Sequence, residues 1–383
     1  MTAGGGAERG ASWPGVDAVG TLIVREISAA VQLRLVPLVV IVCAASCRRA
    51  APIVEQQGAP APPIHATAVP IPLQSPPITG DARTTLRDLF GVPPRPPRVI
   101  AEIEPATNAD PQSNAAGVLV ATVSGGKVVT VYFANGDFHA GGPIDLGTAR
   151  FVATDGPHVC AASRTSMSCA WIDGSSPSSR PVTGETTGLW GGPNVLVRGV
   201  GSATAWSLKA SEDGFLTTRD VGAPARSMLA DLEIETTLHW SAVTIPMEGT
   251  AKPRLALTTD GGKTPVSDFG SVDRIGWSYG DRLWPNMVVT GALSTELVVA
   301  EKGEKRTTIP LPWPAAGGFP WTAGALVLFG RGATGNGGFM LVEVHEKRVT
   351  NFTPPEIRSI IAAGRVGEGI AAITTDGHVV AWP

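Results

Sequence analysis

Short apolar runs separated by turn-forming residues occupy the chain from Val99 to its end. The runs are rich in Val, Leu, Ile, Thr and Trp, and Gly, Asp, Asn or Pro stand between them. Runs of about four to eight residues bounded in this way are typical of β-strands. Clear examples are residues 117–123, 127–133, 194–200, 286–292 and 339–344. Because helical periodicity is not evident here, we predict an all-β domain over residues 98–383.

The same region divides into repeating units. They can be drawn at residues 116–147, 149–182, 186–222, 227–270, 272–312, 317–354 and 357–383. A period of about 40 residues with four strands in each unit is typical of a β-propeller. The last unit has three obvious strands, and residues 98–103 can supply a fourth. We therefore predict a seven-bladed β-propeller closed by an N-terminal strand, which removes free sheet edges. Six or eight blades remain as alternatives.

The segment before this domain predicts export. Residues 35–46 are mostly apolar, and Arg25 and Arg34 precede them. A positive segment followed by a short apolar run and small residues is typical of a secretory signal peptide. A membrane-spanning helix needs roughly 20 apolar residues, and this run has about a dozen.

The end of that run, Ala44-Ala45-Ser46-Cys47, resembles the lipobox of bacterial lipoproteins. The resemblance implies that residues 1–47 form the signal region and that Cys47 carries a lipid. It also implies an exported protein anchored to a bacterial membrane and facing the periplasm or the exterior. Two arginines follow the cleavage point directly, so an uncleaved signal anchor remains as an alternative.

Residues 48–97 are predicted to be a Pro-rich linker, because closely spaced prolines favour extended polyproline II over a sheet. A short helix is predicted within it over residues 82–90. Asp81 is a suitable N-cap, and Gly91 is a suitable residue to end the helix. A helix of this length is not stable by itself, so it either docks on the domain or frays.

Cys160 and Cys169 are the two cysteines of the predicted domain. The residues around them read as two strands with a turn near Arg164 and Thr165, which places the two cysteines opposite each other. Opposed Cβ atoms lie about 4.5–5.5 Å apart, and closer pairs can be bridged. Exported proteins meet oxidising surroundings. We predict a Cys160–Cys169 disulfide, with two buried free thiols as the alternative.

One turn in the domain resembles the Asp-box, the repeat of bacterial neuraminidases. It spans residues 258–264, and the matching positions are Thr258, Asp260, Gly262 and Thr264. A weaker copy spans residues 211–217, where Phe215 occupies the Gly position. In that family the box is a structural hairpin turn away from the active site, so the resemblance implies a propeller. It also raises a glycoside hydrolase of sialidase-like fold as an alternative. Those enzymes need a Tyr nucleophile, and the chain offers Tyr132 and Tyr279.

Other candidate chemistry in the sequence is weak. Residues 330–335 match G-x-G-x-x-G, but a strand follows where a dinucleotide site needs a helix, so we predict a hairpin loop. The histidines lack metal-binding spacing, and we predict no metal and no cofactor. Aspartates in turns are expected to cap them; these are Asp137, Asp155, Asp213, Asp260 and Asp376.

Tryptophans in Pro-rich connections are the remaining candidates for a ligand site. Trp284, Trp313 and Trp321 are expected to be exposed, where they could stack on a sugar or a partner protein. The net charge of −3 gives no field that would attract nucleic acid. The sequence therefore predicts a non-catalytic binding or scaffolding module at the cell envelope. Its partner is an unknown envelope protein or glycan, and a carbohydrate-binding propeller is the first alternative.

Overall fold

The computed structural model describes part of the chain, all within the unit that comprises residues 64–383. The described residues are 78, 80–93, 95–107, 109, 111–201, 206–221, 227–234, 240–246, 254–258, 267–271, 277–280, 286–290, 295–301, 306–322, 324–331, 337–352 and 357–383. The predicted signal region, Cys47 and most of the predicted linker lie outside them. Within these residues, no helix is long and apolar enough to cross a bilayer.

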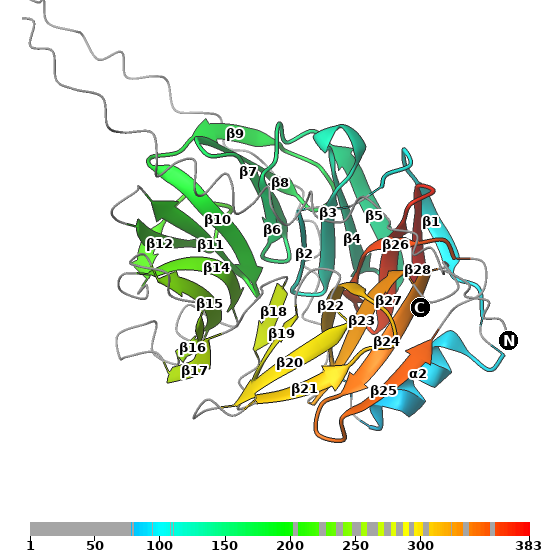
Figure 1. The fold of residues 1–383 in the computed structure, drawn as a ribbon. Coiled ribbons are helices and arrows are strands. Elements are labelled where there is room, and N and C mark those ends of the chain that lie inside the picture. The colour runs from blue at the N-terminus through cyan, green and yellow to red at the C-terminus, as the bar shows by residue number, and fades with distance from the viewer. Residues whose placement is uncertain are drawn as a thin grey trace, which may run out of the picture. The chain divides into compact units, whose positions relative to one another are not determined.

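The described strands form seven antiparallel sheets of four strands each (Figure 1). We number the sheets 1 to 7 in chain order. Sheet 1 contains β2 (Gln112–Ala115), β3 (Val118–Thr122), β4 (Val128–Ala134) and β5 (Asp137–Ile144), with a 3-10 turn at Ser124–Gly126. Sheet 2 contains β6 (Phe151–Thr154), β7 (His158–Ala162), β8 (Ser166–Trp171) and β9 (Ser178–Pro181). Sheet 3 contains β10 (Glu185–Gly192), β11 (Val195–Gly201), β12 (Trp206–Ser211) and β13 (Arg219–Val221).

The remaining sheets continue the same order. Sheet 4 contains β14 (Ser227–Ile234), β15 (Trp240–Pro246), β16 (Arg254–Thr258) and β17 (Ser267–Ser271). Sheet 5 contains β18 (Trp277–Gly280), β19 (Asn286–Thr290), β20 (Glu296–Glu301) and β21 (Arg306–Pro310). Sheet 6 contains β22 (Ala315–Thr322), β23 (Ala325–Arg331), β24 (Gly337–Glu343) and β25 (Arg348–Phe352). Sheet 7 contains β26 (Ile360–Val366), β27 (Gly369–Thr374), β28 (His378–Trp382) and β1 (Arg98–Glu102).

Strand β1 completes the last sheet from the other end of the domain. It pairs antiparallel with β28, with Val99 opposite Val380 and Glu102 opposite His378. The sequence predicted this pairing from the missing fourth strand. It covers an edge of β28 that would otherwise be free to pair with another chain.

The first strands of successive sheets lie next to one another. Strand β2 contacts β6, β6 contacts β10, and the series continues through β14, β18 and β22 to β26. Strand β26 in turn contacts β2 and β3, so the last sheet is a neighbour of the first (Figure 1).

Apolar side chains pack between neighbouring sheets, and this explains the unbroken apolar runs in the sequence. In β3, Val118 and Val120 pack toward sheet 2, whereas Leu119 and Ala121 pack toward sheet 7. A strand covered on both faces has no solvent face on which to alternate polar residues. Burial of both faces therefore explains why apolar residues follow one another along the strand. In a sheet with one face in water, apolar and polar residues would alternate.

Helix α2 (Ala82–Phe90) begins and ends where the sequence predicts. The Asp81 carboxylate accepts hydrogen bonds from the backbone N–H groups of Arg83 and Thr84, and Gly91 ends the helix with a φ of 80°. Leu86 and Phe90 are buried in an apolar cluster together with residues of sheets 6 and 7. The sequence left open whether this helix docks on the domain or frays, and the structure shows that it docks.

Candidate functional site

The exposure predicted for two of the three candidate tryptophans is wrong. Trp313 and Trp321 have 6% and 3% of their surface exposed, so neither can stack on a ligand in solution. Helix α2 helps to bury Trp321, whose indole N–H donates a hydrogen bond of 3.0 Å to the Thr85 hydroxyl. Trp313 lies in the core between sheets 5 and 6. Trp284 lies outside the described residues.

Most of the Asp-box-like turn predicted at residues 258–264 also lies outside the described residues. Thr258 ends β16, and Asp260, Gly262 and Thr264 lie outside the described residues. The weaker copy at residues 211–217 is described in full. It lies beside the two cysteines of sheet 2, and among the described residues this region offers a candidate site.

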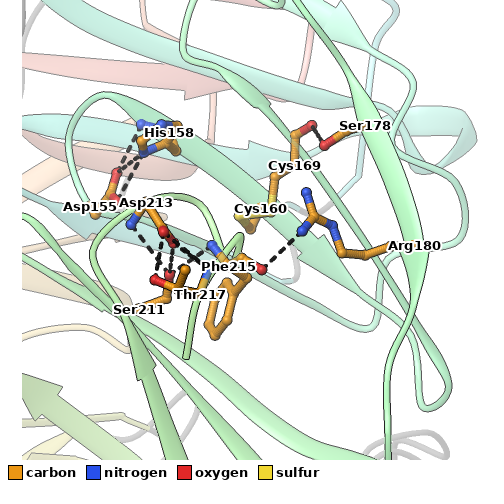
Figure 2. The surroundings of a disulfide bond; sticks show 10 residues. All are labelled: Asp155, His158, Cys160, Cys169, Ser178, Arg180, Ser211, Asp213, Phe215 and Thr217. Atoms are coloured by element: carbon orange, nitrogen blue, oxygen red, sulfur yellow. Dashed lines mark hydrogen bonds and ion pairs between the residues drawn. A yellow bond between two sulfur atoms is a disulfide. The ribbon is translucent and has the colours of Figure 1, made fainter. Parts of the chain in front are cut away.

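The structure joins Cys160 of β7 and Cys169 of β8 in a disulfide (Figure 2). The two residues are directly opposite in the register of the strands, and their Cα atoms are 4.1 Å apart. Both cysteines are buried between sheets 2 and 3, in one apolar cluster with Met167, Leu196 and Phe215. The disulfide therefore lies in the apolar interface between these two sheets.

The turn at residues 211–217 is held by its own side chains (Figure 2). The Ser211 hydroxyl donates to the Asp213 carboxylate at 2.7 Å and accepts from the Phe215 N–H at 2.8 Å. The Asp213 carboxylate also accepts from the Thr217 N–H at 2.9 Å and from its hydroxyl at 2.6 Å. Burial raises the pKa of Asp213, but the bonds from Thr217 and Ser211 outweigh it and leave that pKa below its ordinary value.

Phe215 in this turn has a φ of 65°, in the left-handed region that favours glycine. The Asp-box pattern has Gly at this position, and the backbone conformation gives a physical reason for that preference. Phe215 is held there from two sides. Its N–H is bound by Ser211, and its carbonyl accepts a hydrogen bond of 3.0 Å from the Arg180 guanidinium of sheet 2.

A second turn packs against the first. Asp155 is buried, and its carboxylate accepts from the His158 N–H at 2.8 Å and contacts the imidazole Nδ1 at 3.0 Å. The His158 ring lies 4.7 Å from the Trp171 ring. A side chain added at Gly214 would come within 3.2 Å of His158, so the two turns are in close contact. Asp155 and Asp213 thus cap turns, as the sequence predicts for them.

A hollow of about 380 Å³ opens beside this turn, between sheets 2 and 3. Three cationic side chains line it, namely Arg180 of β9, Arg198 of β11 and Lys209 of β12. Apolar side chains form much of the rest, and they are Met167, Val182, Val200 and Phe215. Such a combination of fixed cations and apolar walls suits a ligand that has both an anionic group and an apolar part.

Only one of the three cationic side chains of the hollow, Lys209, has an ion pair with a carboxylate among the described residues. Arg198, Lys209 and Asp220 are directly opposite one another on the three consecutive strands β11, β12 and β13. Asp220 pairs with Lys209 at 2.6 Å. Arg198 has 6% of its surface exposed and donates a hydrogen bond of 2.6 Å to the Thr183 carbonyl. Burial lowers the pKa of Arg198, because the charged guanidinium loses contact with water.

Three residues with acid–base or nucleophilic side chains, His158, Asp155 and Tyr132, lie in internal contacts. His158 and Asp155, which could form an acid–base pair, bind each other and hold a turn. Across the described part of the chain, no three His, Cys, Asp or Glu residues gather in a metal-binding group. Tyr132 is buried against His139, and burial raises its pKa further from the range of a nucleophile.

The G-x-G-x-x-G segment joins two paired strands. It begins at the end of β23, and β23 pairs with the next strand, β24, so that Arg331 is opposite Gly337. Residues 332–336 lie outside the described residues. The sequence predicted that a strand follows this segment, where a dinucleotide site would need a helix. The structure has strand β24 there.

Arg180, Arg198 and Lys209 are not among the site residues predicted from the sequence. A usable signal was present for Arg198, because it is a lone charge in the apolar strand 194–200. Arg180 and Lys209 stand in short strands with polar neighbours, where an arginine or lysine is ordinary. Their convergence depends on how sheet 2 packs on sheet 3.

No protein-family model matches the sequence, and the comparison with curated proteins gives no match. Solved structures do resemble the fold. YCF48 bound to D1 peptide aligns with a TM-score of 0.51 at 10% identity, over 75% of this chain and 95% of that chain. YCF48 from Cyanidioschyzon merolae gives 0.48 at 9% identity, over 75% and 98%. BBS1N in complex with ARL6DN gives 0.47 at 15% identity, over 74% and 94%.

YCF48 bound to D1 peptide, which aligns with a TM-score above 0.5, is a β-propeller protein. Identities this low bear on the fold and leave function open. Four-stranded antiparallel sheets that follow one another in sequence, with the last beside the first, agree with that likeness. The chain has a β-propeller fold.

Proposed function

We propose that this protein is an exported, membrane-tethered propeller of seven blades that acts as a non-catalytic binding or scaffolding module at the bacterial cell envelope. Each four-stranded sheet would be one blade, with β1 closing the last. The tether would be the lipid on Cys47, and the predicted linker at residues 48–97 would connect it to the blades. The lipobox-like sequence supports export and anchoring.

The hollow between sheets 2 and 3 is the observation that carries the binding function. Its volume of about 380 Å³ lies within the range of about 300–1,000 Å³ that small-molecule sites occupy. Its walls are held in place by the disulfide and by the hydrogen-bonded turn at residues 211–217. A site whose groups are fixed before binding loses less entropy when a ligand arrives.

Carbohydrate binding through exposed tryptophans loses two of its three candidates, because Trp313 and Trp321 are buried, whereas Trp284 lies outside the described residues. A sialidase-like hydrolase gains no support from Tyr132, which is buried beside His139. One structural neighbour is described as bound to a peptide, and another as bound to ARL6DN. Those descriptions concern other proteins, but they are compatible with a protein partner for this fold.

The anchor and the binding function are tested separately. Palmitate labelling of the full chain should disappear in a Cys47→Ala variant, and labelling that persists would contradict the lipid anchor. For binding, a photo-crosslinking residue at Thr218, on the wall of the hollow, should form a discrete adduct in the producing bacterium.

The control position for that experiment is Val92, which is 67% exposed and lies outside the hollow. Adducts of equal yield at Thr218 and Val92, or none at Thr218, would contradict a binding role for the hollow.

A further inference from the structure

We propose that the hollow between sheets 2 and 3 binds a small molecule that carries a carboxylate next to an apolar body. Arg198 and Arg180 hold the carboxylate, and the apolar walls hold the body. The inference rests on the binding function proposed above and names the ligand class of the same site.

The surroundings of Arg198 favour an anionic ligand. Its side chain is buried, and a carbonyl oxygen, that of Thr183, accepts its hydrogen bond. A guanidinium has five N–H donors, and a buried charge is costly unless it is paired and hydrogen-bonded. No carboxylate pairs with Arg198 among the described residues. A ligand carboxylate would supply the missing counter-charge.

Among the described residues that line the hollow, there are three cations and no carboxylate. Lys209 is directly opposite Arg198 across the sheet, and like charges in that position repel each other. Asp220 forms an ion pair with Lys209. The three opposed positions of sheet 3 therefore carry two cations, Arg198 and Lys209, and one carboxylate. Arg180 adds a third cation from sheet 2. An anion in the hollow relieves this excess, although the whole chain carries a net charge of −3.

The side chains of the hollow favour a carboxylate with an apolar body over other anions. The planar guanidinium fork matches a carboxylate, with which it can form two parallel hydrogen bonds. Val182 and Val200 line the same hollow, are half-buried, and offer no polar side-chain atom. Inorganic phosphate would leave these walls uncovered, whereas an acid with an apolar body would bury them.

The groups that would contact the ligand are held in place by contacts within the protein. Arg180 is fixed by its hydrogen bond to the Phe215 carbonyl, and Arg198 by its bond to Thr183. Phe215 in turn is held by Ser211 and packs in the cluster that contains the disulfide. The cations and one apolar wall are thus connected through a single set of contacts.

The test is calorimetric titration of the full chain in mild detergent with N-acetylphenylalanine and with its neutral amide. The two probes have the same apolar body and differ in charge. We expect the acid to bind at least about tenfold more tightly than the amide, as a charge-assisted pair implies. Equal affinities, or no binding of the acid, would overturn the proposal. Inorganic phosphate that binds as tightly as the acid would overturn the ligand class.

Arg198→Gln should remove the preference for the acid and leave the affinity for the amide unchanged. Arg150→Gln is the matched control, because it removes the same charge from an exposed position outside the hollow. A preference that survives in Arg198→Gln would assign the carboxylate to another site. If thermal melting shows that this variant does not fold, Arg180→Gln provides the same comparison and the same criterion.

The outcome is separable from that of the crosslinking experiment. Selective binding of the acid without an adduct at Thr218 would support the ligand class and contradict a protein partner at the hollow. An adduct at Thr218 without selectivity for the acid would support the binding module and overturn the inference.

Discussion

Two junctions between neighbouring sheets of this propeller are filled in opposite ways. Between sheets 6 and 7, helix α2 inserts Leu86 and Phe90, and the Phe90 ring lies 5.5 Å from Phe339 and 5.4 Å from Trp382. Between sheets 2 and 3, a hollow remains and cationic side chains line it. The same pairing of four-stranded sheets therefore gives a sealed core or a candidate site, depending on the side chains at the junction.

Buried charge shows the same contrast. Glu343 at the sealed junction accepts two hydrogen bonds of 2.6 Å from Arg348, and the Arg83 guanidinium of α2 lies 3.5 Å away. Arg198 at the open junction has a carbonyl as its hydrogen-bond acceptor. A paired charge is typical of a structural contact, whereas a cation without a carboxylate suits a ligand that brings one.

The largest effect is expected at the sealed junction. Phe90→Ala removes a buried ring that contacts three other aromatic rings, and it should lower the free energy of unfolding by about 3–5 kcal/mol. Denaturant unfolding of the full chain measures this loss. Val92→Ala, at an exposed position two residues away, should change stability by less than about 0.5 kcal/mol. A similar loss in both variants would show that α2 is not part of the core.

The disulfide comes next. Replacing both Cys160 and Cys169 by Ala should cost about 2–3 kcal/mol, because the short loop that the bond closes becomes free in the unfolded chain. Denaturant unfolding with and without reductant measures this effect. Reductant should destabilise the wild type and leave the double variant unchanged. Mass spectrometry that finds both thiols free in the unreduced wild type would contradict the bond.

The turn beside the hollow should show a smaller, pH-dependent effect. Asp213→Asn removes a carboxylate that binds Thr217 and Ser211, and should cost about 1–2 kcal/mol near neutral pH. The folded-state pKa of Asp213 is below its ordinary value of 3.8, so its contribution is present above that value. The contribution is lost as the pH falls through the lower, folded-state pKa.

Unfolding of the wild type and Asp213→Asn at a series of pH values measures this. The two proteins should differ at pH 6 and converge in strong acid. A difference that does not depend on pH would remove the carboxylate from the explanation.

The smallest effect has opposite signs at the two junctions. Arg198→Met should raise stability by up to about 1 kcal/mol, because it replaces a buried cation that lacks a carboxylate with an apolar side chain of similar length. Arg348→Met should lower stability, because it leaves the buried Glu343 without its main partner. Thermal melts of both variants give the comparison. A loss in Arg198→Met would mean that this arginine is a structural contact.

Local features of this fold could be predicted from the sequence because neighbouring residues determine them. Asp81 and Gly91 mark the ends of α2 through backbone hydrogen bonds and a positive φ, both of which act within a few residues. The opposition of Cys160 and Cys169 follows from one hairpin turn. The fourth strand of sheet 7 required counting strands over the whole domain, and the repeat made that count feasible.

The parts that could not be predicted depend on contacts between distant segments. Trp321 is buried in part because Thr85 and the rest of α2 pack on it from the other end of the domain. The cationic lining of the hollow combines Arg180 of one sheet with Arg198 and Lys209 of the next. Strand patterns do not encode which side chains of two adjacent sheets converge, so the sequence could not identify this site.

A crystal structure of the protein soaked with 4-bromophenylacetate tests the central claim most directly, because anomalous scattering locates the bromine. We predict that the bromine lies in the hollow between sheets 2 and 3 and that the carboxylate lies within hydrogen-bond distance of Arg198. A bromine signal elsewhere on the protein, with the hollow containing water, would contradict it.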